Sequence, residues 1–408
     1  MKKTKQLISV IVSFGVLLSL MAALSFHAYA VEKLTGSCGD NVTYTFDYTT
    51  GELVISGTGD MLISCQDVPD SSVNIVVINQ GVTSIAPYAF SGCVNLRSLT
   101  IPDGITSIGA YAFDNCTSLT GVALPDSVTS IDQGAFAECS NLARIILPSN
   151  LSTIGDGAFE LCESLTSIEI PDQVTSLGRY VFGGCTGLTN ITIGNSVTSI
   201  DEGTFGGCVG LTSVVIPDTV TSIGESAFEE CFNLSSVTIP DSVTSIDEYA
   251  FCGCEVLTSV AIPESVTSIE AFVFEECTNL SSVSIPDGVA SIERGAFEDC
   301  NNLTDIYYEG NETRWNSITI DAYNDALSFA AVHFNAKASD IEFIADDEPG
   351  ADPYQQNNPT KQPTSLSRGV TIAAIIVAAA TSLACIGEGI CIAILLNRRR
   401  HETNGRPN

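Results

Sequence analysis

The sequence predicts a β-rich solenoid, built from ten stacked 23-residue repeats with a cap at each end. Three ladders of identical residues support this fold class. Phenylalanine recurs every 23 residues from Phe90, cysteine keeps the same step from Cys93, and leucine keeps it from Leu96. Recurrence at one fixed period is the sequence signature of a repeat array, in which each unit packs against its neighbours. The two ladders that we expect to form the core are Phe90, Phe113, Phe136, Phe159, Phe182, Phe205, Phe228, Phe251, Phe274 and Phe297, and Cys93, Cys116, Cys139, Cys162, Cys185, Cys208, Cys231, Cys254, Cys277 and Cys300.

Each repeat begins with an extended segment. One unit reads L-x-x-V-x-I-P-x-x-V-x-x-I-x-x-x-A-F-x-x-C-x-x. The residues Leu119, Val122 and Leu124 follow the L-x-x-L-x-L pattern of the strand in leucine-rich repeats. Pro125 then ends the strand, because proline lacks the N–H that a ladder needs. The expected architecture is therefore a leucine-rich-repeat solenoid with a parallel β-sheet.

The second half of each repeat is expected to be shorter and less regular. Val128 and Ile131 have the spacing of inward-facing residues in a second short extended piece, whereas Thr129 and Ser130 face outward. The Ala135-Phe136 stretch then predicts a short helical turn that carries a large core side chain.

Stacking explains why the repeats are so many. One repeat buries about seven apolar side chains at roughly 1.5–3 kcal/mol each, but ordering its backbone costs about 1–2 kcal/mol per residue. A single repeat is therefore unstable. A continuous parallel ladder between neighbouring repeats must supply the stabilising free energy that one repeat lacks. Eleven strands between Val73 and Tyr308 predict a core about 50 Å long.

The repeat pattern breaks down at both ends, as capping units require. Residues 69–308 are expected to form the solenoid and residues 31–68 an N-terminal β cap with a turn at Thr50-Gly51. Asp67 and Asp70 stand where phenylalanine and cysteine would fall. Residues 309–335 are expected to form a C-terminal cap, with Trp315 and Leu327 among its apolar residues.

The two termini predict export and anchoring. Residues 1–30 have the basic start, apolar stretch and Ala28-Tyr29-Ala30 site of a signal peptide. Residues 336–368 read as a polar extracellular linker, and residues 369–396 as a transmembrane helix with one charge, Glu388. The arginines at 398–400 place residues 397–408 in the cytoplasm.

The predicted extracellular part is strongly acidic. Residues 31–368 contain 46 acidic and 9 basic residues, a formal net charge of −37. Such a charge excludes nucleic acids and anionic lipid head groups as expected partners. It favours cations or basic partners instead.

The repeats resemble BspA-like leucine-rich repeats, and IPDSVTSIDEYAFCGCEVLTSVAIP is typical of them. The flanking segments GSCGDNVTYTFDYTTGELVISGTGDM and YYEGNETRWNSITI are also similar to those of this family, so the resemblance covers about residues 36–335. It implies a surface protein, since several members are adhesins, and it implies no catalytic residues and no cofactor. No L-P-x-T-G sorting motif precedes the apolar tail.

The cysteines have two possible states. Stacked cysteines would lie close enough for disulfides, but equivalent side chains point the same way, which favours buried free thiols. Cys38 and Cys65 lie outside the ladder, and both a disulfide and free thiols are open for them. His333 is the one histidine of residues 31–368, so neither a zinc site nor a catalytic triad is expected.

Acidic residues form a column after the strand-ending prolines. An Asx-turn, in which the carboxylate accepts a backbone N–H two residues on, explains this column, and calcium bridging is the alternative. Paired acids after Phe228, Phe274 and Phe297 predict a solvated acidic edge. The weak calcium candidates are Asp218, Asp241, Glu264 and Asp287.

The outward residues of the first strand of each repeat form the expected binding face. Eighteen of its thirty positions from Arg97 to Tyr307 are serine or threonine. The candidate ligand-binding residues are the charged and aromatic exceptions: Arg97, Arg144, Glu169, Asp305 and Tyr307. We expect a non-enzymatic protein that mediates adhesion through an extracellular protein or glycan. The alternative is an envelope scaffold that binds the surface polymers of the producing cell.

Overall fold

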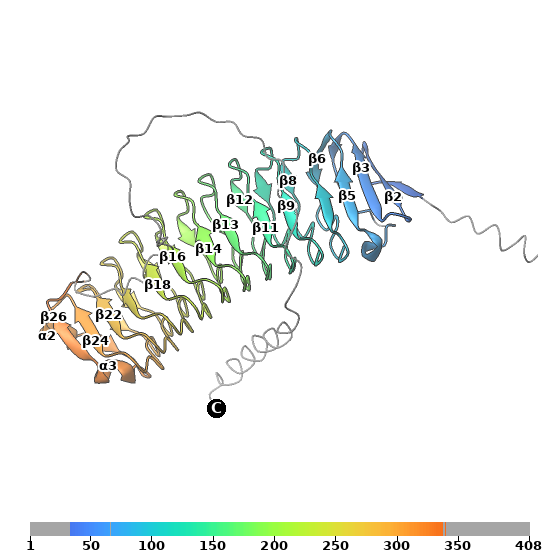
Figure 1. Ribbon diagram of the computed structural model, residues 1–408. Helices are drawn as coiled ribbons and strands as arrows, with labels where there is room; N and C mark the ends of the chain where they lie inside the picture. Colours follow the sequence, from blue (N-terminus) through green and yellow to red (C-terminus); the bar gives the residue numbers. More distant parts are fainter. Residues whose placement is uncertain (1–32, 66, 338, 340–408) are drawn as a thin grey trace, which may run out of the picture. The chain divides into compact units, whose positions relative to one another are not determined.

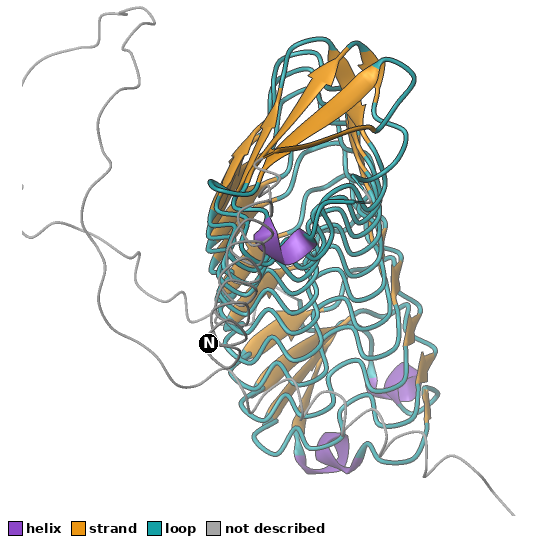
Figure 2. Ribbon diagram, turned by 90° about the vertical axis from the view of Figure 1, so that its right-hand side faces the viewer, coloured by secondary structure: helices purple, strands orange, loops and turns teal. Residues whose placement is uncertain are grey.

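The computed structural model describes residues 33–65, 67–337 and 339 of the 408-residue chain. These residues form a solenoid in which most turns contribute one strand to each of two rows (Figure 1). Figure 2 shows the two rows on different sides of the stack, with loops between them. Neighbouring strands are parallel and offset by 23 residues, as in Arg144 opposite Gly121. The predicted solenoid is confirmed.

The first row forms the strand face. Most of its strands follow the ladder leucines, and in five of them the central residue is buried while both flanking residues are exposed. The strands are β5 (Ile75–Ile78), β7 (Ser98–Thr100), β9 (Gly121–Ala123), β11 (Arg144–Ile146), β13 (Ser167–Glu169), β14 (Asn190–Thr192), β16 (Ser213–Val215), β18 (Ser236–Thr238), β20 (Ser259–Ala261), β22 (Ser282–Ile285) and β24 (Asp305–Tyr308).

The hydrogen-bond ladder of this row is not continuous, contrary to our expectation. Among the described residues β9 pairs only with β11, β13 with β14, and β16 with β18. Three-residue strands offer few ladder bonds, so a small change of orientation between turns is enough to break the pairing. Backbone bonds outside the strands still join the turns across the breaks, as from Ser164 N, in the turn before β13, to Ser140 O, in the turn before β11 (3.1 Å).

The second row consists mostly of two-residue strands. It is tied together by threonine, whose backbone N–H and hydroxyl both donate to the carbonyl of the preceding turn, as from Thr129 to Thr106. The strands are β4 (Gly59–Asp60), β6 (Val82–Ile85), β8 (Ser107–Ile108), β10 (Ser130–Ile131), β12 (Thr153–Ile154), β15 (Ser199–Ile200), β17 (Ser222–Ile223), β19 (Ser245–Ile246), β21 (Ser268–Ile269) and β23 (Ser291–Ile292).

The core is a column of stacked phenylalanine rings. All ten ladder phenylalanines are buried, and the centroids of adjacent rings lie 5.2 to 5.7 Å apart. Adjacent rings are within 20° of parallel. Each inner ring therefore contacts an equivalent ring on both faces, which is an interaction that no isolated repeat can make.

The phenylalanine segment is a series of turns and not a helical turn, so that expectation was wrong. The residue two before each ladder phenylalanine has a left-handed backbone, as in Tyr88 (φ 56°) and Gly134 (φ 59°). The residue two after it is also left-handed, as in Asn115 (φ 55°). A right-handed helix cannot run through such residues. The helices among the described residues lie in the end regions instead.

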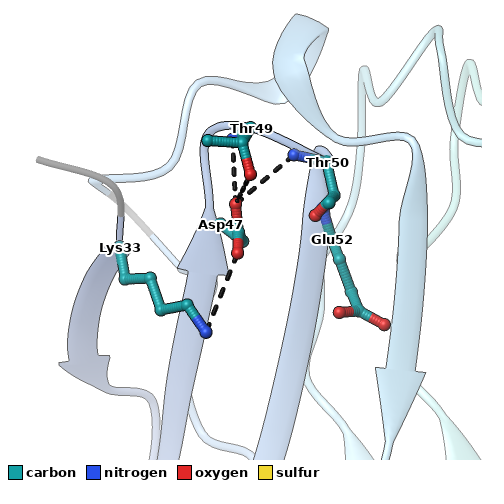
Figure 3. Close-up of polar contacts among 5 residues, drawn as sticks. All are labelled: Lys33, Asp47, Thr49, Thr50 and Glu52. Atoms are coloured by element: carbon teal, nitrogen blue, oxygen red, sulfur yellow. Dashed lines mark hydrogen bonds and ion pairs between the residues drawn. The ribbon is translucent and has the colours of Figure 1, made fainter. Parts of the chain in front are cut away.

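The N-terminal region is an antiparallel meander of β1 (Lys33–Ser37), β2 (Val42–Asp47) and β3 (Glu52–Gly57), followed by the 3₁₀ helix η1 (Asp70–Ser72). Asp47 fixes the turn between β2 and β3, because its carboxylate accepts the N–H groups of Thr49 and Thr50 and pairs with Lys33 (3.7 Å; Figure 3). β3 then pairs with β5 in parallel, so the strand face begins earlier in the chain than Val73.

The C-terminal region makes one further, irregular turn. It contains α2 (Glu312–Trp315), β25 (Thr319–Ile320), α3 (Asp325–Phe329) and β26 (Ala331–Phe334). β25 extends the second row beside β23, and β26 extends the strand face beside β24. The strand face therefore also ends later than Tyr308.

Asn324 closes the end of the stack. In the inner turns the N–H of each ladder phenylalanine donates to a carbonyl of the next turn, as from Phe274 to Ala296 (2.9 Å). Phe297 donates instead to the side-chain oxygen of Asn324 (3.0 Å), and the side-chain amide of Asn324 donates to Glu293 O (2.8 Å). One buried side chain thus replaces the partners that a further repeat would provide.

The predicted signal peptide, the transmembrane helix with Glu388, the cytoplasmic tail and nearly all of the linker lie outside the described residues. Within the described part of the chain, no helix has the length and apolar character needed to cross a bilayer.

Candidate binding surface

Some hydroxyl groups of the strand face serve the stack itself. The residue after the ladder leucine is often serine or threonine, and in four turns its hydroxyl donates to the carbonyl one turn back. Examples are Thr189 to Thr166 (3.1 Å), Ser235 to Thr212 (3.1 Å) and Ser281 to Thr258 (3.0 Å). These hydroxyl protons are already used, so serine and threonine in these four turns have a structural reason that does not involve a ligand.

Three of the predicted binding residues lie apart from one another. Arg97 precedes β7, Arg144 begins β11 and Glu169 ends β13, and each is exposed. None of the three takes part in an ion pair within the described residues. They are isolated charges on separate turns and do not form a site together.

The other two predicted residues lie together at the C-terminal end of the face. Asp305 and Tyr307 both project from β24, and His333 lies opposite Tyr307 on β26. The imidazole Nε2 of His333 is 2.7 Å from Asp305 Oδ1, and its ring stacks on Tyr307 at a centroid distance of 4.9 Å. We call these three residues the C-terminal patch.

The electrostatics of the C-terminal patch are set by hydrogen bonds to one carboxylate. His333 and then Thr304, whose hydroxyl is 2.8 Å from Oδ2, hold the pKa of Asp305 below its ordinary value. The aspartate is therefore ionised and oriented across the normal pH range. The side chain of His333 is 46% exposed, so the imidazole remains open to solvent while one edge is held.

This arrangement contains groups of the kind that ligand recognition uses. It offers a tyrosine ring, an imidazole and an oriented carboxylate within one small area, and tyrosine is enriched among residues that dominate binding energy. A nucleophilic mechanism would require a hydroxyl or thiol hydrogen-bonded to the imidazole. In the described part of the chain, no such bond joins His333 to a serine or cysteine.

Sequence reasoning placed Asp305 and Tyr307 on the face but missed the role of His333. The histidine is 28 residues from Asp305, outside the 23-residue period that aligns the other turns. The residue pattern of β26 could have indicated this role. His333 lies between the apolar residues Val332 and Phe334, so in a strand its side chain takes the outward position.

The acidic column does not form Asx-turns. The turn after each proline is closed by the backbone, as from Val128 N to Pro125 O (3.1 Å) and from Val243 N to Pro240 O (3.0 Å). Asp218, Asp241 and Glu264 are exposed, whereas Asp287 pairs with Arg314 (2.8 Å). No group of three or more metal-binding side chains occurs among the described residues, so the calcium alternative gains no support from geometry.

The acidic edge is partly desolvated, which differs from the solvated rim that we expected. Burial, and next the charge of Glu298, raise the pKa of Glu275 to about 7. The thiol of Cys252 donates to its carboxylate (3.6 Å). Burial also raises the pKa of Glu230 on this edge.

The ladder cysteines are free, buried thiols with a defined hydrogen bond. From Cys116 to Cys300 each ladder thiol donates to the carbonyl of a phenylalanine in the preceding turn, at 3.1 to 3.4 Å. Burial raises the pKa of these thiols, for example that of Cys185 to about 12. Their regular spacing thus reflects one sulfur–carbonyl bond per turn.

The sequence matches a known repeat family. The family model described as "BspA type Leucine rich repeat region" matches in six copies over residues 69–189, 152–248, 179–304 and 223–344. No curated protein matches the chain.

Two solved structures of bacterial proteins are similar to the chain. A leucine-rich repeat protein from Bacteroides ovatus is 28% identical, with a TM-score of 0.54 over 72% of this chain and 78% of the other. A leucine rich cell surface protein from Faecalibacterium prausnitzii is 27% identical, with a TM-score of 0.37 over 71% of this chain and 98% of the other.

Proposed function

Because the chain belongs to the BspA-type leucine-rich-repeat family, we propose that it is a cell-surface protein that binds an extracellular protein or glycan through the C-terminal patch. The proposal includes export by residues 1–30 and anchoring by a single helix at 369–396, as the sequence predicts. The solenoid then presents its strand face to a ligand outside the cell.

The observation that carries this proposal is the grouping of Asp305, Tyr307 and His333 on an otherwise hydroxyl-lined face. Elsewhere on the face a few hydroxyls bond the turns to one another, and Arg97, Arg144 and Glu169 are isolated charges. Within the described part of the strand face, only this patch combines an aromatic ring with two polar groups that are oriented by their neighbours. Such a combination gives both contact area and direction to an interaction.

A binding role also agrees with the chemistry of the solenoid. Leucine-rich-repeat solenoids are typically binding scaffolds, whose extended faces carry the interaction. The net charge of the predicted extracellular part favours a ligand that is neutral or basic where it meets the acidic chain.

The binding test uses glycan and matrix-protein arrays probed with residues 31–368. We expect the signal to fall at least tenfold in Tyr307→Ala and His333→Ala. Tyr48→Ala, which removes a 46% exposed tyrosine at the opposite end of the stack, should bind normally. Equal binding by all three variants would disprove the assignment of the patch.

An envelope scaffold is the alternative function, and the structural use of several strand-face hydroxyls favours it. Antibody labelling of intact cells distinguishes the two, with wall-stripped cells as the control. Labelling of intact cells supports outward display, whereas labelling only after stripping would move the function to the envelope.

A further inference from the structure

Two cysteines at the N-terminal end differ from the ladder cysteines. Cys38 and Cys65 are both buried, and the interaction between their side chains lowers the pKa of Cys38 and raises that of Cys65. The inner ladder thiols are bonded to backbone carbonyls instead, which keeps adjacent sulfurs in parallel positions. Among the thiols that the structure describes, Cys38 and Cys65 are therefore the pair whose side chains converge.

The backbone holds the two cysteine segments together. Leu62 N and Ile63 N both donate to Cys38 O, at 2.7 and 3.2 Å, and Cys38 N donates to Val42 O (2.9 Å). The segment that carries Cys65 is thereby fixed against the start of β2. A cross-link between the two sulfurs would join the meander β1–β3 to the segment that leads into the first regular turn.

One of the two thiols borders the surface. A hollow of about 390 Å³ at this junction is lined by Ser64, Cys65, Val68, Asp70, Tyr88, Ala89 and Ser91. The hollow provides a path for a small oxidant to Cys65, whereas the side chain of Cys38 lies deeper, with its residue 0% exposed.

We propose that Cys38 and Cys65 form a redox-dependent disulfide that staples the N-terminal meander to the solenoid. The co-reactant is a small-molecule disulfide, R–S–S–R. The Cys65 thiol loses its proton and attacks one sulfur of R–S–S–R, which releases R–S⁻. Cys38, as a thiolate, then attacks Cys65 Sγ and releases a second R–S⁻.

The reaction balances without another oxidant. The two protein thiols are oxidised to one disulfide, R–S–S–R is reduced to two R–SH, and the two protein protons end on the released thiolates.

The staple acts where a repeat array is weakest. Terminal units have a neighbour on one side only, so opening begins at the ends. A disulfide that closes a loop of about 30 residues reduces the opening equilibrium by on the order of a hundredfold. The oxidised protein should therefore hold its N-terminal end closed under conditions that fray the reduced protein.

The test starts from the reduced full-length chain, treated with oxidised glutathione at pH 8 while folded. Free thiols are then alkylated under denaturing conditions. Digestion must cut at glutamate, because trypsin leaves Cys38, Cys65 and Cys93 on one peptide between Lys33 and Arg97. Glu52 lies between the paired cysteines, so the linked peptides separate on reduction.

We expect one linkage, Cys38 to Cys65, with the inner ladder cysteines alkylated and free as internal controls. Amide exchange in β1–β3 should slow by on the order of a hundredfold on oxidation. Cys38→Ser should abolish both effects, and the wild-type comparison of oxidised with reduced protein stands even if this variant does not fold. Linkage of Cys65 to Cys93, free thiols at 38 and 65, or unchanged exchange after linkage would each overturn the proposal.

Discussion

Truncation of a ladder phenylalanine tests whether the solenoid behaves as a one-dimensional stack. Phe205 is fully buried in the middle of the array, and its ring centroid lies 5.7 Å from that of Phe182 and 5.3 Å from that of Phe228. Replacing a buried phenylalanine by alanine costs about 3–5 kcal/mol. Phe205→Ala should lie in the upper half of that range, because stacking contributes about 0.5–1.5 kcal/mol per pair and two pairs are lost.

Phe90 provides the comparison at the end of the column. Its ring stacks on one ladder ring only, that of Phe113 at 5.2 Å. Phe90→Ala should therefore cost about 1 kcal/mol less than Phe205→Ala, since one stacked pair is lost in place of two. Its effect should also remain local, because a terminal unit can open alone whereas a central defect divides the array.

The assay is urea unfolding followed by circular dichroism, with both variants and wild type measured at one pH and temperature. Phe329→Ala is the matched control, because this phenylalanine is 84% exposed and its loss should change the unfolding free energy by less than about 0.5 kcal/mol. Equal losses at Phe90 and Phe205 would refute the stacking argument, and so would a large loss at Phe329.

Three further outcomes follow from the geometry. Asn324→Ala should lower the free energy of unfolding by about 1–3 kcal/mol in thermal melts, because Phe297 N–H and Glu293 O lose their buried partner. Asn316→Ala, at an exposed asparagine, should lower it little, and equal effects of the two variants would contradict the capping role. The inner ladder cysteines should resist alkylation in the folded protein and react after denaturation without reductant; two disulfides within the ladder, detected by mass spectrometry, would rule this out. Stability should rise as the pH falls from 8 through about 7 towards 5, because the folded pKa of Glu275 lies above its ordinary value and the native state takes up the proton first. Glu275→Gln should flatten this pH dependence in denaturant titrations, whereas Glu169→Gln, at an exposed residue, should not. If the unfolding free energy of Glu275→Gln changed with pH as steeply as that of wild type, Glu275 would not be the group responsible.

The period of the sequence determined most of the fold. In a solenoid, residues that are equivalent in sequence become neighbours in space, so the recurrence of Phe90, Cys93 and Leu96 was sufficient to predict three buried columns. The same logic assigned the outward positions and placed Asp305 and Tyr307 on the strand face. These inferences needed no knowledge of the chain path, because each repeat is packed against a copy of itself.

The tertiary structure decided what the period cannot specify. The left-handed residues on both sides of each phenylalanine replace the expected helical turn, and many different residue types occupy those positions, so the pattern gave little sign of them. Asn324 lies 27 residues from its partner Phe297, and His333 lies 28 residues from Asp305. Neither interval is the period, because the irregular C-terminal turn inserts helix α2 before Asn324 and both α2 and α3 before His333. At the other end, Cys65 lies near Cys38 because the meander β1–β3 turns the chain back in place of a repeat. Where a unit has no copy of itself as neighbour, contacts depend on the path of the loops, and only the folded chain specifies that path.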